Sequence, residues 1–181
     1  MDFIDEEGYR ANVGIILMDG DGHVLIAGRR GRGGWQFPQG GVRPDESTES
    51  AMYRELREEV GLGPNDVELV GQTRDWLRYR LPQRYVRREQ TPLCVGQKQR
   101  WFLLQLNCDP GRLRFDLTDE PEFDRCRWVD YWRPVKEVIY FKRLVYVRAL
   151  AELGPLAFPH SGPPAPPAWW PRRWQRACGL G

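Results

Sequence analysis

Histidine is nearly absent from this chain, whose 181 residues include only His23 and His160. Two histidines so far apart argue against a histidine-based catalytic triad or a histidine-rich metal site, and we expect both at the surface. Cysteine is also scarce: there are four, widely spaced, and no Cys-x-x-Cys pair. Zinc binding and thiol redox chemistry are therefore disfavoured, and we interpret the cysteines as buried thiols of a reducing cytosol.

The chain also lacks a long hydrophobic run. No apolar segment approaches the roughly 18 residues that span a membrane. The acidic N-terminus, MDFIDEEGYR, has neither the basic nor the apolar region of a secretory signal. We therefore expect a cytoplasmic protein with no membrane partner. The net charge is +2, and residues 154–181 hold three arginines and no acid, so the remaining body carries −1. Any contact with nucleic acid must come from a local basic patch.

Apolar and turn patterns predict one α/β domain over residues 1–153. Two apolar runs, residues 13–18 and 24–30, flank two Asp-Gly turns and predict a β-hairpin. A helix should begin after an N-cap at Ser47 and stop at Gly61. Further strands are expected at residues 67–75, 76–81, 99–108 and 123–131, the third of them central, and a helix in two pieces at 133–153.

Residues 154–181 differ in composition from the body. Seven of the chain's 15 prolines fall between positions 155 and 181, so we predict a disordered, basic tail. Its WWPRRW segment combines tryptophan with arginine, a pair suited to contact RNA or a protein partner. A dispensable tail is the simpler interpretation.

The segment RELREEVGL places Glu55, Glu58 and Glu59 on one face of the predicted helix. Met52, Leu56 and Val60 form a neighbouring apolar stripe that can pack on a sheet. Taken alone, the three carboxylates are best explained as a solvated helix face, with Arg54 pairing to Glu58 at i+4.

The wider spacing favours a metal site instead. The chain matches every position of the Nudix box, and on this pattern it resembles the Nudix hydrolase family. The box positions are Gly40, Glu46, Arg54, Glu55, Leu56, Glu58, Glu59, Gly61 and Leu62. The resemblance implies the Nudix fold, an α/β/α sandwich with a central mixed β-sheet.

The chemistry of these residue types fits that resemblance. Carboxylate oxygens are hard ligands for Mg²⁺ or Mn²⁺, and the double glycine lets backbone approach a ligand. Such ions neutralise polyphosphate and lower the pKa of a bound water, which leads to hydrolysis of a phosphoanhydride. Carried over from the family, Glu55, Glu58 and Glu59 become metal ligands and catalytic residues, one of them as general base. The carbonyl of Gly40 and Glu122 in PEFD become further ligands, with more than one ion bound.

The resemblance extends beyond the box. The blocks GYRANVGI, WQFPQGG, DWLRYRLP, VGQKQRWFLLQL, PEFDRCRWV and YWRPVKEVIYFKR, over about residues 8–150, are similar to bacterial RNA pyrophosphohydrolases, also called (di)nucleoside polyphosphate hydrolases. That family removes pyrophosphate from the 5′-triphosphate end of RNA and leaves a 5′-monophosphate that marks the transcript for decay. By the same resemblance, Arg10, Arg29 and Lys142 contact the 5′ end, while Phe141, with Ile139 beside it, forms an apolar platform for a base.

Two alternatives remain open at this point. A dinucleoside polyphosphate hydrolase would use the same chemistry on another substrate. A non-catalytic scaffold that binds nucleotides is disfavoured, because every box carboxylate is present. Residues 78–100 also hold seven arginines and lysines interleaved with two tyrosines. These side chains either extend an electropositive route for RNA or are ordinary ion-paired surface residues.

Overall fold

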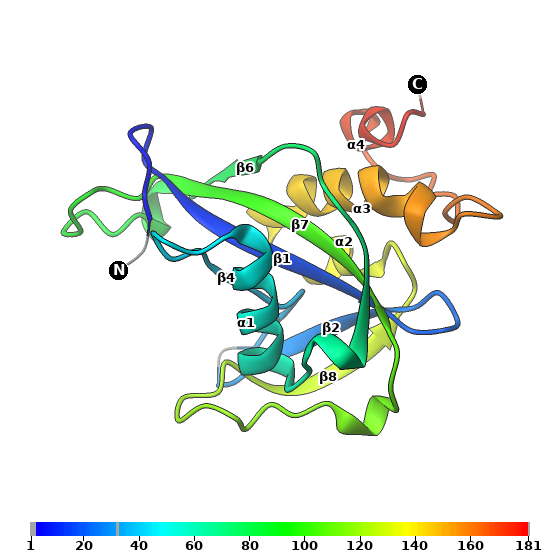
Figure 1. Cartoon of the computed structure of the whole chain (residues 1–181). Coiled ribbons are helices and arrows are strands. Elements are labelled where there is room, and N and C mark those ends of the chain that lie inside the picture. Colours follow the sequence, from blue (N-terminus) through cyan, green and yellow to red (C-terminus); the bar gives the residue numbers. More distant parts are fainter. Residues whose placement is uncertain (1–2, 32, 181) are drawn as a thin grey trace.

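The computed structural model describes residues 3–31 and 33–180 of the chain. Within these residues, eight strands form one sheet (Figure 1). They are β1 (Tyr9–Met18), β2 (Val24–Arg29), β3 (Trp35–Gln36), β4 (Gln39–Gly41), β5 (Val67–Gln72), β6 (Leu77–Arg80), β7 (Gly96–Leu106) and β8 (Phe123–Val129). The helices are α1 (Thr48–Val60), α2 (Arg133–Glu137), α3 (Arg143–Ala157) and α4 (Arg172–Ala177). None of the described helices combines the length and the apolar character needed to cross a bilayer.

The parallel pair β1 and β7 forms the centre of the sheet. Ten residue pairs join these strands, from Tyr9 with Gly96 to Met18 with Gln105. Every other strand pair is antiparallel, so the sheet is mixed, as predicted. The expected hairpin is β1–β2, and the expected central strand is β7. Both strands are buried along most of their length because helices cover the two faces of the sheet.

Helix α1 covers one face and begins and ends where the sequence predicts. The side chain of Ser47 accepts a hydrogen bond from the backbone N–H of Ser50, and Gly61 takes the left-handed conformation at φ 75°. The predicted apolar stripe is fully buried against β1 and β7. Its members are Met52, Leu56 and Val60. The helix is therefore fixed on one flank and presents its glutamates on the next.

Helices α2 and α3 cover the opposite face, in the two pieces that the sequence predicts. The hydroxyl of Tyr146 accepts a hydrogen bond of 2.9 Å from the backbone N–H of Phe37, and the two rings stack in the core beside Trp101. This bond ties α3 to the segment between β3 and β4. The α3 helix thereby supports the segment that leads into β4, the strand that carries the double glycine.

The C-terminal segment differs from the prediction of disorder. Helix α3 continues to Ala157, and α4 then packs on it (Figure 1). Trp170 and Trp174 are 3% and 7% exposed and extend the core cluster of this face, whereas Trp169 is 68% exposed. The ring of Trp170 lies 5.3 Å from that of Trp132. Two tryptophans therefore anchor the segment despite its prolines. A domain limit at residue 153 stays a prediction.

Replacing Trp170 by alanine should lower the free energy of unfolding by about 3 kcal/mol, because the substitution empties a large buried site. Trp169→Ala is the matched control, because the ring of Trp169, the residue next to Trp170, is exposed. We expect its free energy of unfolding to change by no more than about 0.5 kcal/mol. Urea unfolding followed by circular dichroism measures both variants. Equal stability of the two would contradict a packed C-terminal segment.

Candidate active site

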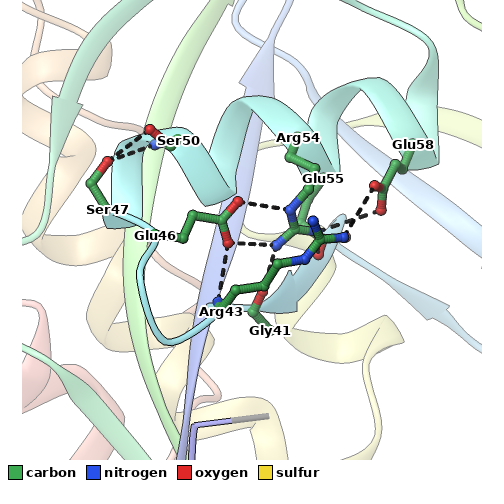
Figure 2. Close-up of polar contacts among 8 residues, drawn as sticks. All are labelled: Gly41, Arg43, Glu46, Ser47, Ser50, Arg54, Glu55 and Glu58. Atoms are coloured by element: carbon green, nitrogen blue, oxygen red, sulfur yellow. Dashed lines mark hydrogen bonds and ion pairs between the residues drawn. The ribbon is translucent and has the colours of Figure 1, made fainter. Parts of the chain in front are cut away.

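The guanidinium of Arg54 contacts carboxylates from two parts of the chain, helix α1 and the loop before it (Figure 2). Its Nε and Nη2 donate to the two carboxylate oxygens of Glu46 at 2.8 and 2.9 Å, and Nη2 also donates to the carbonyl of Gly41 at 2.7 Å. Its Nη1 contacts Glu55 and lies 3.4 Å from Glu58 Oε2. Arg54 thus joins the loop that follows β4 to the helix, and the predicted pair with Glu58 is confirmed.

Glu46 is consequently a partner of Arg54 rather than a free acid. The hydrogen bonds from the guanidinium hold the pKa of Glu46 below its usual value. The bidentate geometry explains the six-residue spacing from Gly40, because the turn between them brings Glu46 back over α1. The sequence pattern located this position but did not show which residue it binds.

Gly40 lies directly beneath the carboxylate of Glu55. A Cβ atom added at Gly40 would lie 1.9 Å from Glu55 Cδ, so no other residue fits without displacing the carboxylate or the strand. Glu55 is 8% exposed, and burial raises its pKa despite the nearby guanidinium. The glycine of the box is therefore a steric requirement of the glutamate that follows it by 15 positions.

Glu59 is the most deeply placed of the three helix glutamates. It is 7% exposed, and its Oε2 accepts a hydrogen bond of 2.9 Å from the backbone N–H of Gln39. Burial and the neighbouring carboxylates of Glu122 and Glu55 raise the pKa of Glu59 well above its usual value. A buried carboxylate beside two others is a strong electrostatic complement for a cation.

Glu122 is distant in sequence from the α1 glutamates and lies immediately before β8. Its Oε1 lies 3.3 Å from Gln36 Nε2, which donates to it, and 4.0 Å from Arg29 Nε. Its carboxylate is close enough to Glu59 to raise the pKa of that group. The structure therefore brings Glu122 to the α1 carboxylates, as the resemblance implied, although its role there stays a prediction.

A cavity of about 900 Å³ opens beside these carboxylates. Seven of the predicted site residues line it, namely Arg10, Arg29, Gly40, Glu122, Ile139, Phe141 and Lys142. The three helix glutamates are not among the lining residues. Two of them are next to residues that do line it: Glu55 lies against Gly40, and Glu59 accepts a hydrogen bond from Gln39. The predicted residues for the 5′ end and the predicted metal ligands thus occupy adjoining parts of one site.

Lys142 connects the two parts through Gln39. Its Nζ donates to Gln39 Oε1 at 3.2 Å, while the backbone N–H of Gln39 binds Glu59. Lys142 is 8% exposed, and burial, with the nearby charge of Arg29, lowers its pKa to about 8. We did not predict a role for Gln39. Its only signal in the sequence is its place in WQFPQGG, directly before the double glycine.

The basic segment at residues 78–100 separates into two groups. Four of its cations have structural partners: Arg78 pairs with Glu7, Lys98 with Asp5, Arg80 donates to Tyr9 and Arg100 to the carbonyl of Arg74. Within the described chain, no ion pair is found for the other three, Arg84, Arg87 and Arg88. Of the seven cations, Arg78 and Lys98 are therefore ion-paired surface residues, whereas no ion pair with a described carboxylate is found for the other five.

A different acidic cluster forms in the β1–β2 hairpin. Ligand atoms of Asp19, Asp21 and His23 lie within 4.8 Å of one another, the one such group of three among the residues described. Asp19 Oδ1 accepts from the backbone N–H groups of Asp21 and His23, both at 2.9 Å, so the turn itself accounts for this arrangement. The glutamates of α1 form no group this tight, and Arg54 lies between Glu55 and Glu58.

The donor set around Glu59 nevertheless fits a hard divalent cation. Its candidate donors are carboxylate oxygens: Glu55 and Glu122 lie close enough to act on Glu59, and Glu58 acts on Glu55. The backbone N–H of Gln39 donates to the buried Glu59 carboxylate, and the side chain of Glu122 also contacts this carboxylate. Ions bound here would offset the repulsion that raises the pKa of this group.

Comparison with known proteins places this geometry in context. A family model described as NUDIX domain matches residues 8–148. The RNA pyrophosphohydrolase of Alkalilimnicola ehrlichii is 55% identical over 94% of this chain and 94% of that protein. The RNA pyrophosphohydrolase of Thioalkalivibrio sulfidiphilus is 58% identical over 88% of this chain and 92% of that protein.

Solved structures agree on the fold. The dihydroneopterin triphosphate pyrophosphohydrolase of E. coli superimposes with a TM-score of 0.58 at 19% identity, over 75% of this chain and 91% of that chain. A C. elegans Ap4A hydrolase superimposes with a TM-score of 0.56 at 17% identity, over the same shares. At such identities the likeness concerns the fold alone.

Gly40→Ala should weaken Mn²⁺ binding at least about tenfold, because the new methyl group displaces the Glu55 carboxylate. Gly63→Ala is the matched control, since the nearest atom to a Cβ at that position is 3.8 Å away and its φ is −109°. Electron paramagnetic resonance of free Mn²⁺ measures the affinity. Equal affinities of the two variants would rule out Glu55 as a ligand.

Proposed function

This chain belongs to the Nudix family, and from that premise we propose that it removes pyrophosphate from the 5′-triphosphate end of RNA. In this reaction water attacks phosphorus, pyrophosphate leaves, and the RNA keeps a 5′-monophosphate. The main support is a cavity lined by Glu122, three cationic side chains and an aromatic wall at Phe141, beside the buried carboxylates of Glu55 and Glu59. The curated relatives that match most of the chain are RNA pyrophosphohydrolases, which supports the choice of substrate.

The carboxylates of α1 and Glu122 would hold the divalent ions. The α1 carboxylates are those of Glu55, Glu58 and Glu59, and the carbonyl of Gly40 would be a further oxygen ligand. Together these oxygens are enough for more than one Mg²⁺ or Mn²⁺. Such ions, when bound, neutralise phosphate charge and acidify a bound water. The proton of the attacking water goes to one of the three helix glutamates, which acts as the general base.

The cationic side chains would bind the 5′ polyphosphate. Arg10 and Arg29 line the cavity on the side of the sheet, and Lys142 enters it from the turn before α3. Lys142 is positioned by its hydrogen bond to Gln39, so its ammonium points toward the carboxylates rather than into solvent. These side chains hold the phosphates next to the metal ligands, where binding energy is used to orient the reacting bond.

The aromatic wall, formed by Phe141, would bind the nucleoside at the 5′ end. Phe141 lies next to Lys142 in the chain, and Ile139, which is 40% exposed, borders the same cavity. A base stacked on this platform would leave its phosphates directed at Lys142. The substrate for such a site is a nucleotide with an unpaired base, as at a single-stranded 5′ end. We place this activity in the cytoplasm, where transcripts carry such ends.

The test is a substrate comparison with the purified full chain and Mg²⁺. We expect 5′-triphosphorylated RNA to yield pyrophosphate and 5′-monophosphorylated RNA, with a kcat/KM at least about tenfold above that for diadenosine tetraphosphate. Chelation by EDTA should abolish the reaction. Absence of a monophosphorylated product would refute the proposal, and the reverse ratio would establish the dinucleoside polyphosphate as the preferred substrate.

Glu59→Gln should lower kcat at least about 100-fold, because it removes the charge of a proposed metal ligand. The melting temperature without metal should not fall, since the substitution also removes a poorly compensated buried charge. Glu49→Gln, on the exposed first turn of the same helix, should keep near-full activity. Retained activity in Glu59→Gln would contradict the assignment of this residue.

A further inference from the structure

Two exposed tyrosines adjoin the aromatic wall of the cavity. Tyr85 and Tyr140 are 40% and 50% exposed, and their ring centroids lie 5.1 and 5.4 Å from that of Phe141. Both residues line the same cavity as Phe141. Tyr79 also contacts Phe141, at 5.9 Å, but is only 8% exposed and belongs to the core. Packing therefore accounts for Tyr79 but leaves Tyr85 and Tyr140 partly open to solvent.

Arg84 holds the two exposed rings together. Its Cζ lies 5.0 Å from the Tyr85 ring centroid and 5.6 Å from that of Tyr140, and its Nη2 is 3.2 Å from the Tyr140 hydroxyl. The three side chains come from two 3₁₀ turns, residues 83–85 and 140–142, that are far apart in sequence. A planar guanidinium between two rings makes a surface on which a flat heterocycle can stack.

The charge of this surface favours an anionic polymer. Within the described residues no carboxylate pairs with Arg84, and the same holds for Arg87 and Arg88, the next cations along the chain. Glu89 is the one acidic residue between positions 78 and 100. Nucleic-acid phosphates would be attracted to this edge of the cavity, and stacked aromatic rings are the usual complement to such cations in single-strand binding.

The surface is connected to the proposed catalytic site through adjacent contacts. Phe141 touches both tyrosines, Lys142 follows it in the chain, and Gln39 links Lys142 to Glu59. An RNA whose 5′ phosphates lie at Lys142 and whose base stacks on Phe141 leads its next nucleotides over the tyrosines. The RNA would therefore run in one direction, from its 5′ phosphates at Lys142 outward to its next nucleotides at the tyrosines.

We propose that Arg84, Tyr85 and Tyr140 form a stacking site for a nucleobase of single-stranded RNA, downstream of the nucleotide at Phe141. This inference rests on the proposed function for its direction along the RNA. The site recognises a base by its π-face, which every base presents, so it tolerates every sequence. It makes productive binding depend on the length of the RNA.

The binding test uses 5′-monophosphorylated RNA of one to six nucleotides, which needs no hydrolysis. Fluorescence anisotropy with the full chain should show affinity rising with length, then levelling off. In the double variant Tyr85→Ala/Tyr140→Ala, the Kd of the longer oligonucleotides should rise at least about tenfold, while that of the mononucleotide changes less than about twofold. Equal Kd values of variant and wild type at every length would overturn the proposal.

The matched control is Tyr85→Phe/Tyr140→Phe, which keeps both rings and removes only the hydroxyls. It should bind within about threefold of wild type. Arg84→Lys keeps the charge but loses the planar group, and it should weaken binding of the longer oligonucleotides alone. If the phenylalanine variant loses as much affinity as the alanine variant, stacking is not the interaction and the proposal fails.

Kinetics separate this inference from the proposed function. If triphosphorylated RNA is a substrate, the alanine variant should raise KM for a hexanucleotide at least about tenfold with kcat within about twofold, and leave both values unchanged for a nucleoside triphosphate. If wild type hydrolyses no RNA but the length-dependent binding is lost in the variant, the proposed function fails and the stacking site stands.

Discussion

The guanidinium of Arg54 is the interaction on which the site depends. It binds both oxygens of Glu46, the carbonyl of Gly41 and the carboxylates of α1, so one side chain fixes the distance between the glycine loop and the helix (Figure 2). Without a cation at that point, three carboxylates and a backbone carbonyl would repel one another. The arginine lets the loop close tightly enough for Gly40 to reach Glu55. It is a positioning residue, since two of its partners, Glu55 and Glu58, are groups proposed to bind metal.

Much of the fold could be predicted because its signals are local. The limits of α1 follow from Ser47 and Gly61, and its buried face follows from a three- and four-residue spacing. The C-terminal segment could not be predicted in this way. Its proline content suggested disorder, whereas Trp170 is ordered by Trp132, and nothing in the local sequence reveals a partner nearly 40 residues away. Composition gives only the average tendency of a segment to be disordered. Here the burial of two rings, those of Trp170 and Trp174, is enough to order the segment.

The site shows the same division. Spacing alone located the α1 glutamates, and the resemblance to RNA pyrophosphohydrolases indicated Glu122 and Lys142, which the structure brings to one place. Neither approach assigned Gln39, because its role depends on contacts across three elements. Exposure was also unpredictable: Tyr79 and Tyr85 are alike in sequence context, yet one is buried and the other faces solvent. The difference arises from the sheet, since Tyr79 lies on β6 and Tyr85 on the turn beyond it.

The parallel pairing of β1 with β7 has a consequence for biosynthesis. Tyr9 pairs with Gly96 and Met18 with Gln105, so the first strand to leave the ribosome has no central partner until more than half of the chain has been made. Helix α1 forms from local signals in the meantime, but Phe102 and Leu104, which complete its apolar contact, arrive with β7. Until β7 is made, the apolar face of α1 therefore lacks these two contacts, and residues of β1 and β2 are the ones available to cover it.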